Sequence, residues 1–153
     1  MEIIAGKLIA QLPFQDDLIR VGDLIHFEGP LLTLFEDSKS DDLYLYEWAD
    51  KDDEYNRWLI YRALPELLSN FIQQTISYEE FFHAAIKNGF YIVDINQKLE
   101  YCNPKFVEYE DLPATYKPDR ESYFDEADTP HFNRIKNFIN KYLQKGYLQK
   151  ADY

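Results

Sequence analysis

The chain has 153 residues, of which 46% are hydrophobic and 17% aromatic, and its 28 acidic and 16 basic side chains give a formal net charge of −12. A chain of this length and hydrophobic content can bury a core as one domain and is too apolar to remain disordered. The excess of acid argues against direct binding to a nucleic-acid backbone, and it favours a basic partner or simple solubility.

Covalent and targeting signals are few. A single cysteine, Cys102, excludes an intramolecular disulfide and a multi-cysteine zinc site. The N-terminal apolar residues are interrupted by Lys7 and Gln11, unlike the continuous apolar stretch of a signal peptide. Apolar runs elsewhere are too short to span a bilayer. We therefore predict one domain over residues 1–153, located in the cytoplasm and not associated with a membrane.

The first part of the chain contains one clear hairpin. Residues 1–20 fit a broad helical face about as well as an irregular pair of strands, with a break at Pro13. From Leu18 to Phe27 the apolar pattern predicts a strand that enters a turn at Gly29-Pro30. The second strand of this predicted hairpin comprises residues 31–35.

Two further strands with clear alternation are predicted at residues 43–48 and 55–62. In the first, Leu43, Leu45 and Glu47 alternate with three aromatic residues. The connections at 36–42 and 49–54 are polar and acidic. Strands at this spacing, joined by polar turns, predict an antiparallel meander.

Two short helices follow the meander. Pro65 suits the first turn of a helix near residues 65–74. The sequence Ser77-Tyr78-Glu79-Glu80 fits a capping box, which predicts a second helix over 78–88. Gly89 is able to adopt the left-handed conformation that ends such a helix.

The last third of the chain is predicted to hold two strands, a surface loop and a helix. The strands are expected at 90–95 and 99–107, the second at a sheet edge or bulged because of Pro104. Residues 108–128 are acidic and predict a long surface loop. A helix near 130–145 is predicted from Thr129 as its N-cap, Pro130 as its first residue and Gly146 as its end. The predicted fold is therefore α+β, with an antiparallel sheet of about five or six strands and two or three helices on one face.

The sequence lacks the common catalytic signatures. The three histidines do not have the spacing of a zinc site, no Gly-x-Ser-x-Gly or Gly-rich phosphate loop occurs, and Cys102 has no histidine nearby in sequence. We predict no catalytic residue, no metal and no cofactor. One enzymatic alternative is a metal-dependent, nuclease-like site at Asp37 and Lys39, with Asp23 or Glu28 as a second carboxylate.

The strongest functional signal is a run of acids and aromatics in residues 36–55, which predicts a surface that binds a basic protein. The candidate partner-binding residues are Asp41, Asp42, Tyr44, Tyr46, Trp48, Asp50, Asp52, Asp53, Glu54 and Tyr55. The main hypothesis is a non-enzymatic protein–protein interaction module. A DNA mimic, or a toxin-neutralising inhibitor of a basic nucleic-acid-binding protein, is an alternative. Acidic turns that only confer solubility are the simplest explanation of the same run.

Residues 25–85 also carry a pattern of strands with a known counterpart. Gly29-Pro30-Leu31-Leu32-Thr33-Leu34-Phe35, Leu43-Tyr44-Leu45 and Arg57-Trp58-Leu59-Ile60-Tyr61 lead into the helical residues 64–82. This pattern resembles a family of short bacterial proteins of unknown function. The resemblance implies a bacterial, intracellular origin and the three-strand arrangement. It assigns no catalytic residue, because that family has no assigned activity.

Overall fold

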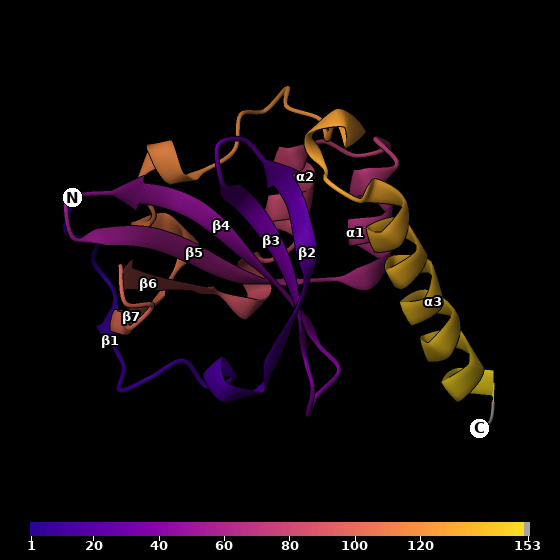
Figure 1. Cartoon of the computed structure of the whole chain (residues 1–153), viewed down its shortest axis with the longest axis horizontal. Helices are drawn as coiled ribbons and strands as arrows, with labels where there is room; N and C mark the ends of the chain where they lie inside the picture. Colours follow the sequence, from indigo (N-terminus) through magenta and orange to yellow (C-terminus); the bar gives the residue numbers. More distant parts are fainter. Residues whose placement is uncertain (152–153) are drawn as a thin grey trace.

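The fold is α+β, built on one seven-stranded antiparallel sheet (Figure 1). The computed structural model describes residues 1–151, and it describes side chains as far as Lys145. The strands are β1 (Lys7–Leu8), β2 (Leu18–His26), β3 (Pro30–Asp37), β4 (Leu43–Lys51), β5 (Tyr55–Ala63), β6 (Phe90–Asn96) and β7 (Tyr101–Val107). Their order across the sheet is β1-β7-β6-β5-β4-β3-β2. The class agrees with the prediction, but the strands number seven rather than five or six.

The additional strand is β1, which lies at the opposite edge of the sheet from β2. It pairs with β7 through Lys7 and Leu8 only, a match too short to leave an alternating pattern. The segment 9–17 must therefore cross one whole face of the sheet to reach β2, and it ends in a 3₁₀ turn at Gln15–Asp17. Residues 1–20 thus form neither a helical face nor a strand pair with each other.

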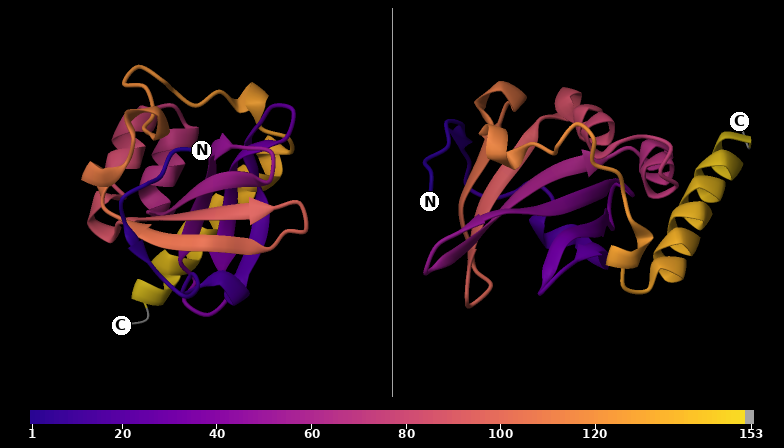
Figure 2. Two further views of the ribbon diagram at one scale, coloured as in Figure 1. Left: turned by 90° about the vertical axis from the view of Figure 1, so that its left-hand side faces the viewer. Right: turned by 90° about the horizontal axis from the view of Figure 1, so that it is seen from above.

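The other face of the sheet is covered by helices. Helix α1 (Pro65–Ile72) begins with its proline, and α2 (Tyr78–His83) begins with the predicted capping box, because Ser77 and Glu80 bond to each other's backbone N–H. The second helix is shorter than predicted and continues as a 3₁₀ turn at Ile86–Asn88. Helix α3 (Phe132–Ala151) lies beside α1 and the outer strand β2 (Figures 1 and 2).

Both predicted ends of the last helix are wrong. Thr129 does not cap it; its hydroxyl donates to the carbonyl of Leu24, so it ties the chain to β2. His131 has a positive φ of 57°, which is incompatible with a helix, so α3 starts at Phe132. The helix also continues through Gly146 to Ala151.

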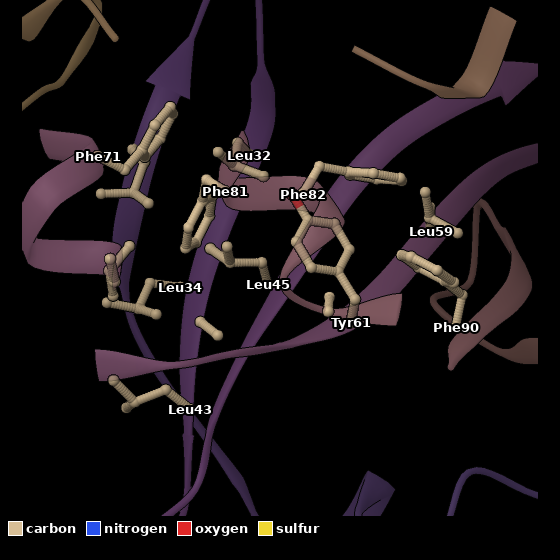
Figure 3. Close-up of a cluster of buried hydrophobic side chains, with 14 of the residues drawn as sticks. Leu32, Leu34, Leu43, Leu45, Leu59, Tyr61, Phe71, Phe81, Phe82 and Phe90 are labelled. Carbon is tan, nitrogen blue, oxygen red and sulfur yellow. The ribbon is translucent and has the colours of Figure 1, made fainter. Parts of the chain in front are cut away.

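The main core lies between the sheet and the helices (Figure 3). Leucines from β3, β4 and β5 meet an aromatic group in which Phe71 stacks on Phe81 and Phe82 stacks on Phe90. Tyr61 contacts Phe82 edge to face at 5.1 Å. Offset and edge-on aromatic contacts of this kind stabilise a core beyond the area that they bury.

The segment 108–128 is more than a surface loop. It forms 3₁₀ turns at Tyr109–Asp111, Ala114–Tyr116 and Glu126–Asp128. Between its acidic residues, Leu112, Tyr116 and Phe124 are buried in the main core. The prediction overlooked these three anchors because they are too widely spaced to form a periodic pattern.

Strand β7 contains the predicted irregularity. Asn103 has a φ of 52°, and the pairing of β6 with β7 shifts between Ile92 and Asp94. The strand is bulged but is not at the edge, because β1 covers it and the N–H of Ile9 donates to the carbonyl of Pro104.

Gly89 provides a test of local packing. Its φ is +72°, and a Cβ atom placed there would lie 2.3 Å from the ring of Phe106. We expect Gly89→Ala to lower the free energy of unfolding by about 2–3 kcal/mol, measured by urea denaturation. The double variant Gly89→Ala/Phe106→Leu should recover the part due to the clash. If the single variant is as stable as wild type, the described packing of Phe106 on Gly89 is wrong.

Candidate functional site

The face of the sheet opposite the helices is aromatic and only half covered. The crossing segment 9–17 buries Leu12 and Phe14 against it. Phe14 stacks on Tyr44 with ring centroids 4.1 Å apart, and it meets Tyr91 edge-on at 5.3 Å. An irregular segment of the chain itself, which ends in a 3₁₀ turn, therefore covers one half of this face.

The other half is an open hollow of about 440 Å³, which we call the aromatic groove. The β2–β3 hairpin forms one wall, the β6–β7 hairpin forms the other, and β4 and β5 form the floor. The lining residues are Arg20, Asp23, His26, Pro30, Thr33, Phe35, Tyr46, Asn56, Trp58, Ile95, Asn96, Leu99 and Tyr101. Strands two to five places apart can line one hollow because the sheet curls (Figure 2).

Aromatic and polar contacts shape the groove. The Tyr46 and Tyr101 hydroxyls are 3.1 Å apart, which links β4 to β7 across the floor. Phe35 packs against Tyr46 with ring centroids at 4.5 Å. On the β2 wall, Asp23 accepts hydrogen bonds from Arg20 at 2.6 Å and from Thr33 at 2.8 Å. The charge of Arg20 is thereby neutralised, so the groove has an aromatic floor and a polar rim.

Acidic side chains surround the open end of the groove. By the strand register, the β2–β3, β4–β5 and β6–β7 turns all stand at the same end of the sheet. They carry five exposed carboxylates, Glu28, Asp52, Asp53, Glu54 and Glu100, and one exposed ammonium, Lys98. Leu99 lies at the tip of the third hairpin, 79% exposed, with a φ of 62°. Leu99 therefore places an exposed apolar side chain at the rim of the aromatic groove.

The structure divides the predicted partner-binding residues into two groups. Asp41 and Asp42 lie in the β3–β4 turn, whereas the β4–β5 turn lies at the other end of β4. Nine residues of strand separate them, about 30 Å at the usual rise. They do not form one continuous surface.

Several of those predicted residues have structural partners. Tyr46 is 4% exposed and belongs to the core beneath the crossing segment. Asp42 pairs with Arg62 at 2.7 Å, and Tyr44 holds Phe14. Asp52 accepts from the N–H groups of its own turn, and Trp48 donates to Asn56.

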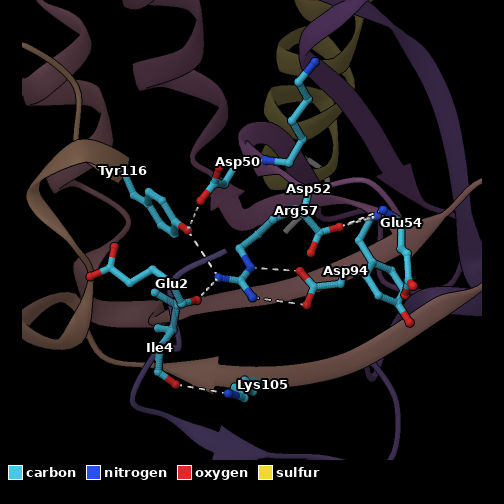
Figure 4. Close-up of polar contacts among 11 residues, drawn as sticks. Glu2, Ile4, Asp50, Asp52, Glu54, Arg57, Asp94, Lys105 and Tyr116 are labelled. Atoms are coloured by element: carbon cyan, nitrogen blue, oxygen red, sulfur yellow. Dashed lines mark hydrogen bonds and ion pairs between the residues drawn. The ribbon is translucent and has the colours of Figure 1, made fainter.

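Asp50 and Tyr55 lie beside a buried polar network on the helical side (Figure 4). Arg57, 8% exposed, donates to Asp94 at 2.8 and 3.2 Å and to the backbone carbonyl of Glu2 at 2.5 Å. Tyr116 accepts from Arg57 at 3.3 Å and donates to Asp50 at 3.3 Å. Although burial opposes it, the Asp94 carboxylate raises the pKa of the Arg57 guanidinium. The network fixes the N-terminal residues against β5.

A second polar cluster is centred on Glu47, on the same face of β4 as the core leucines. Its Oε1 atom accepts from the Tyr78 hydroxyl and, at 3.4 Å, from the Tyr61 hydroxyl. Burial raises the pKa of the Glu47 carboxyl to about 7, and the two tyrosines only partly oppose that shift. The alternation of Glu47 with Leu43 and Leu45 could have revealed this buried-face carboxyl from sequence.

The residues of the proposed metal alternative have other roles. Asp37 is buried and accepts from the backbone N–H groups of Lys39 and Ser40; these bonds lower its pKa although burial opposes them. Asp23 is held by Arg20 and Thr33. Within residues 1–151, no three side chains of His, Cys, Asp or Glu are grouped to hold a metal ion.

Comparisons with family models, curated proteins and solved structures gave no match for this chain. None of the helices in the described part of the chain is long and apolar enough to cross a bilayer.

Proposed function

We propose that this chain is a non-enzymatic interaction module of bacterial, cytoplasmic origin that binds an extended segment of a basic protein in the aromatic groove. The observation that supports this proposal best is the half-filled aromatic face. Its covered half already holds a segment of the chain, 9–17, through Leu12 and Phe14, both almost fully buried. Its open half offers the same kind of surface, including Phe35 and Trp58. No segment of residues 1–151 fills this half.

Charge indicates the chemistry of the partner. The chain has a net charge of −12, and the turns at the open end of the groove carry five exposed carboxylates against one exposed lysine. A basic segment is therefore attracted and oriented by the same end of the sheet that offers the aromatic floor. We infer a segment with an aromatic or leucine anchor next to Lys or Arg. The DNA-mimic alternative is less well supported, because the two acidic turns lie at opposite ends of β4 and do not form a continuous row.

The substitution Leu99→Asn tests the groove. Asparagine tolerates the positive φ of this position better than leucine does, so the fold should be as stable as wild type or slightly more stable. Binding should fall roughly tenfold because an exposed anchor is lost. Phage-displayed random peptides selected on the wild-type protein provide the defined ligands, and calorimetry measures their affinities.

Two pairs of charge substitutions test whether binding depends on the rim of the aromatic groove or only on the net charge of the protein. Asp53→Lys/Glu54→Lys changes the rim and leaves Asp52, which shapes the turn, in place. Asp16→Lys/Glu66→Lys makes the same change in net charge at exposed positions away from the hairpin tips. The first pair should abolish most peptide binding at low salt, and the second should have little effect. Equal loss in both pairs, or full binding by Leu99→Asn, would contradict the proposed site.

A further inference from the structure

A second hollow lies on the helical side of the sheet, around Glu47. Its volume is about 350 Å³, within the range of small-molecule sites. Strands β2, β3 and β4 form its base, and the segment 115–122 covers it. The lining residues are Ile25, Leu31, Glu47, Trp48, Ala49, Tyr78, Thr115, Tyr116, Lys117, Pro118, Asp119 and Ser122.

One oxygen of Glu47 remains available to this hollow. Oε1 accepts both tyrosine hydroxyls, and within residues 1–151 no hydrogen bond engages Oε2. Every fully buried side-chain nitrogen or oxygen in residues 1–145 has a partner, so Oε2 is not fully buried. The carboxyl is therefore fixed on one side by Tyr61 and Tyr78 and open on the other.

The surroundings favour a cation. Asp119 adds a second carboxylate, and the Lys117 ammonium is engaged by the ring of Tyr109 at 4.1 Å. Trp48, Tyr78 and Tyr116 supply aromatic walls, which attract a cation through the negative face of the ring. Ile25 and Leu31 make the base apolar.

We propose that the Glu47 hollow binds a small molecule that carries an ammonium or guanidinium-type group on an apolar body, with Glu47 Oε2 accepting from the cationic group. The site lies on the opposite face from the aromatic groove, so a result that contradicts one proposal leaves the other unaffected. The tyrosine hydroxyls compensate part of the charge of Glu47, and the bound cation supplies the rest.

Defined probes test this proposal. Benzamidine and phenethylammonium should give saturable NMR shifts of the Trp48 indole N–H and of the backbone of residues 115–122. Benzyl alcohol, which is neutral and similar in size, should bind at least roughly tenfold more weakly, because it lacks the charged hydrogen bond. If both cations fail to bind at millimolar concentration, or if benzyl alcohol binds equally well, the proposal is overturned.

Glu47→Gln and Glu66→Gln are matched variants with the same change in charge. Glu47→Gln keeps the shape of the protonated acid, so it should fold normally and bind the cations at least roughly tenfold more weakly. Glu66 is exposed on α1, and its replacement should have no effect. Unchanged binding by Glu47→Gln would contradict the assignment.

The dependence of binding on pH gives an independent readout. The groups that face Glu47 are Tyr61 from β5, Tyr78 from α2, and Tyr116, Lys117 and Asp119 from the covering segment, while β2 and β3 contribute apolar residues. With a Glu47 pKa of about 7, affinity should rise about tenfold from one pH unit below that value to one above. Tyr78→Phe removes a donor to the ionised form, so its midpoint should shift to higher pH. A flat profile in wild type would contradict the role of Glu47.

Discussion

Replacing Arg57 with methionine should lower the free energy of unfolding by about 3–5 kcal/mol, the range for a buried ion pair that loses one partner. Arg57 and Asp94 are 8% and 5% exposed, so the remaining carboxylate would be left without a cation and largely out of water. The variant also loses the hydrogen bond to the Glu2 carbonyl, which fixes the N-terminal residues. Urea denaturation followed by circular dichroism measures the loss.

Two comparisons make the Arg57 prediction specific. The double variant Arg57→Met/Asp94→Leu should recover most of the stability, because it removes both charges and not just one. Arg62→Met breaks the Arg62–Asp42 pair, which is much more exposed, and should cost less than about 1 kcal/mol. A loss in Arg57→Met no larger than that in Arg62→Met would refute the structural role of the network.

The meander could be predicted because each of its strands has one apolar face. Leu43 and Leu45 in β4 and Leu59 and Tyr61 in β5 all lie in the main core, as their alternation indicated. The capping box at Ser77 was equally local, since both of its hydrogen bonds join residues three apart. The elements that could be predicted from sequence are therefore those determined by residues close together in the chain.

Contacts between distant residues determined the features that were missed. Strand β1 pairs with β7, and Gly6 beside it lies so close to Phe106 that a Cβ atom would be 2.9 Å from the carbonyl oxygen. The start of α3 was misplaced because the Thr129 hydroxyl bonds to Leu24, more than a hundred residues away. Neither interaction leaves a periodic or spacing signal in the sequence.

In the candidate site, too, local features could be predicted from the sequence, whereas contacts between distant residues could not. The acidic turns were visible as charge, but their placement at opposite ends of β4 follows from the register. The aromatic groove joins residues of six strands, so Trp58 and Tyr101 become neighbours only when the sheet curls. Sequence reasoning identified one acidic turn at the rim, Asp52 to Glu54, and Tyr46 in the floor, and it missed the other residues of the floor.

Glu47→Gln should make the protein more stable than wild type at pH values above 7 and should have little effect near pH 4.5. In the folded protein burial raises the pKa of this carboxyl from 4.5 to about 7. Between those values the folded state holds a proton that the unfolded state has lost. Wild-type stability therefore falls as the pH rises through this window, and the loss is complete above the folded pKa. Glutamine cannot ionise, so the variant avoids the loss.

The size and sign of this change in stability distinguish it from the effect of removing an exposed charge. The shift in pKa corresponds to a gain of about 2 kcal/mol for Glu47→Gln at high pH, after a reduction because the Glu47 residue is half-buried and solvent screens part of its charge. Paired urea titrations of the two proteins across the window measure it, and the difference cancels the contributions of all other carboxyls. Glu66→Gln should show no such divergence, because that side chain is exposed. A constant difference between wild type and Glu47→Gln at every pH would mean that the pKa of Glu47 is the same in the folded and unfolded states, and the tyrosine-held, proton-binding carboxyl would have to be abandoned.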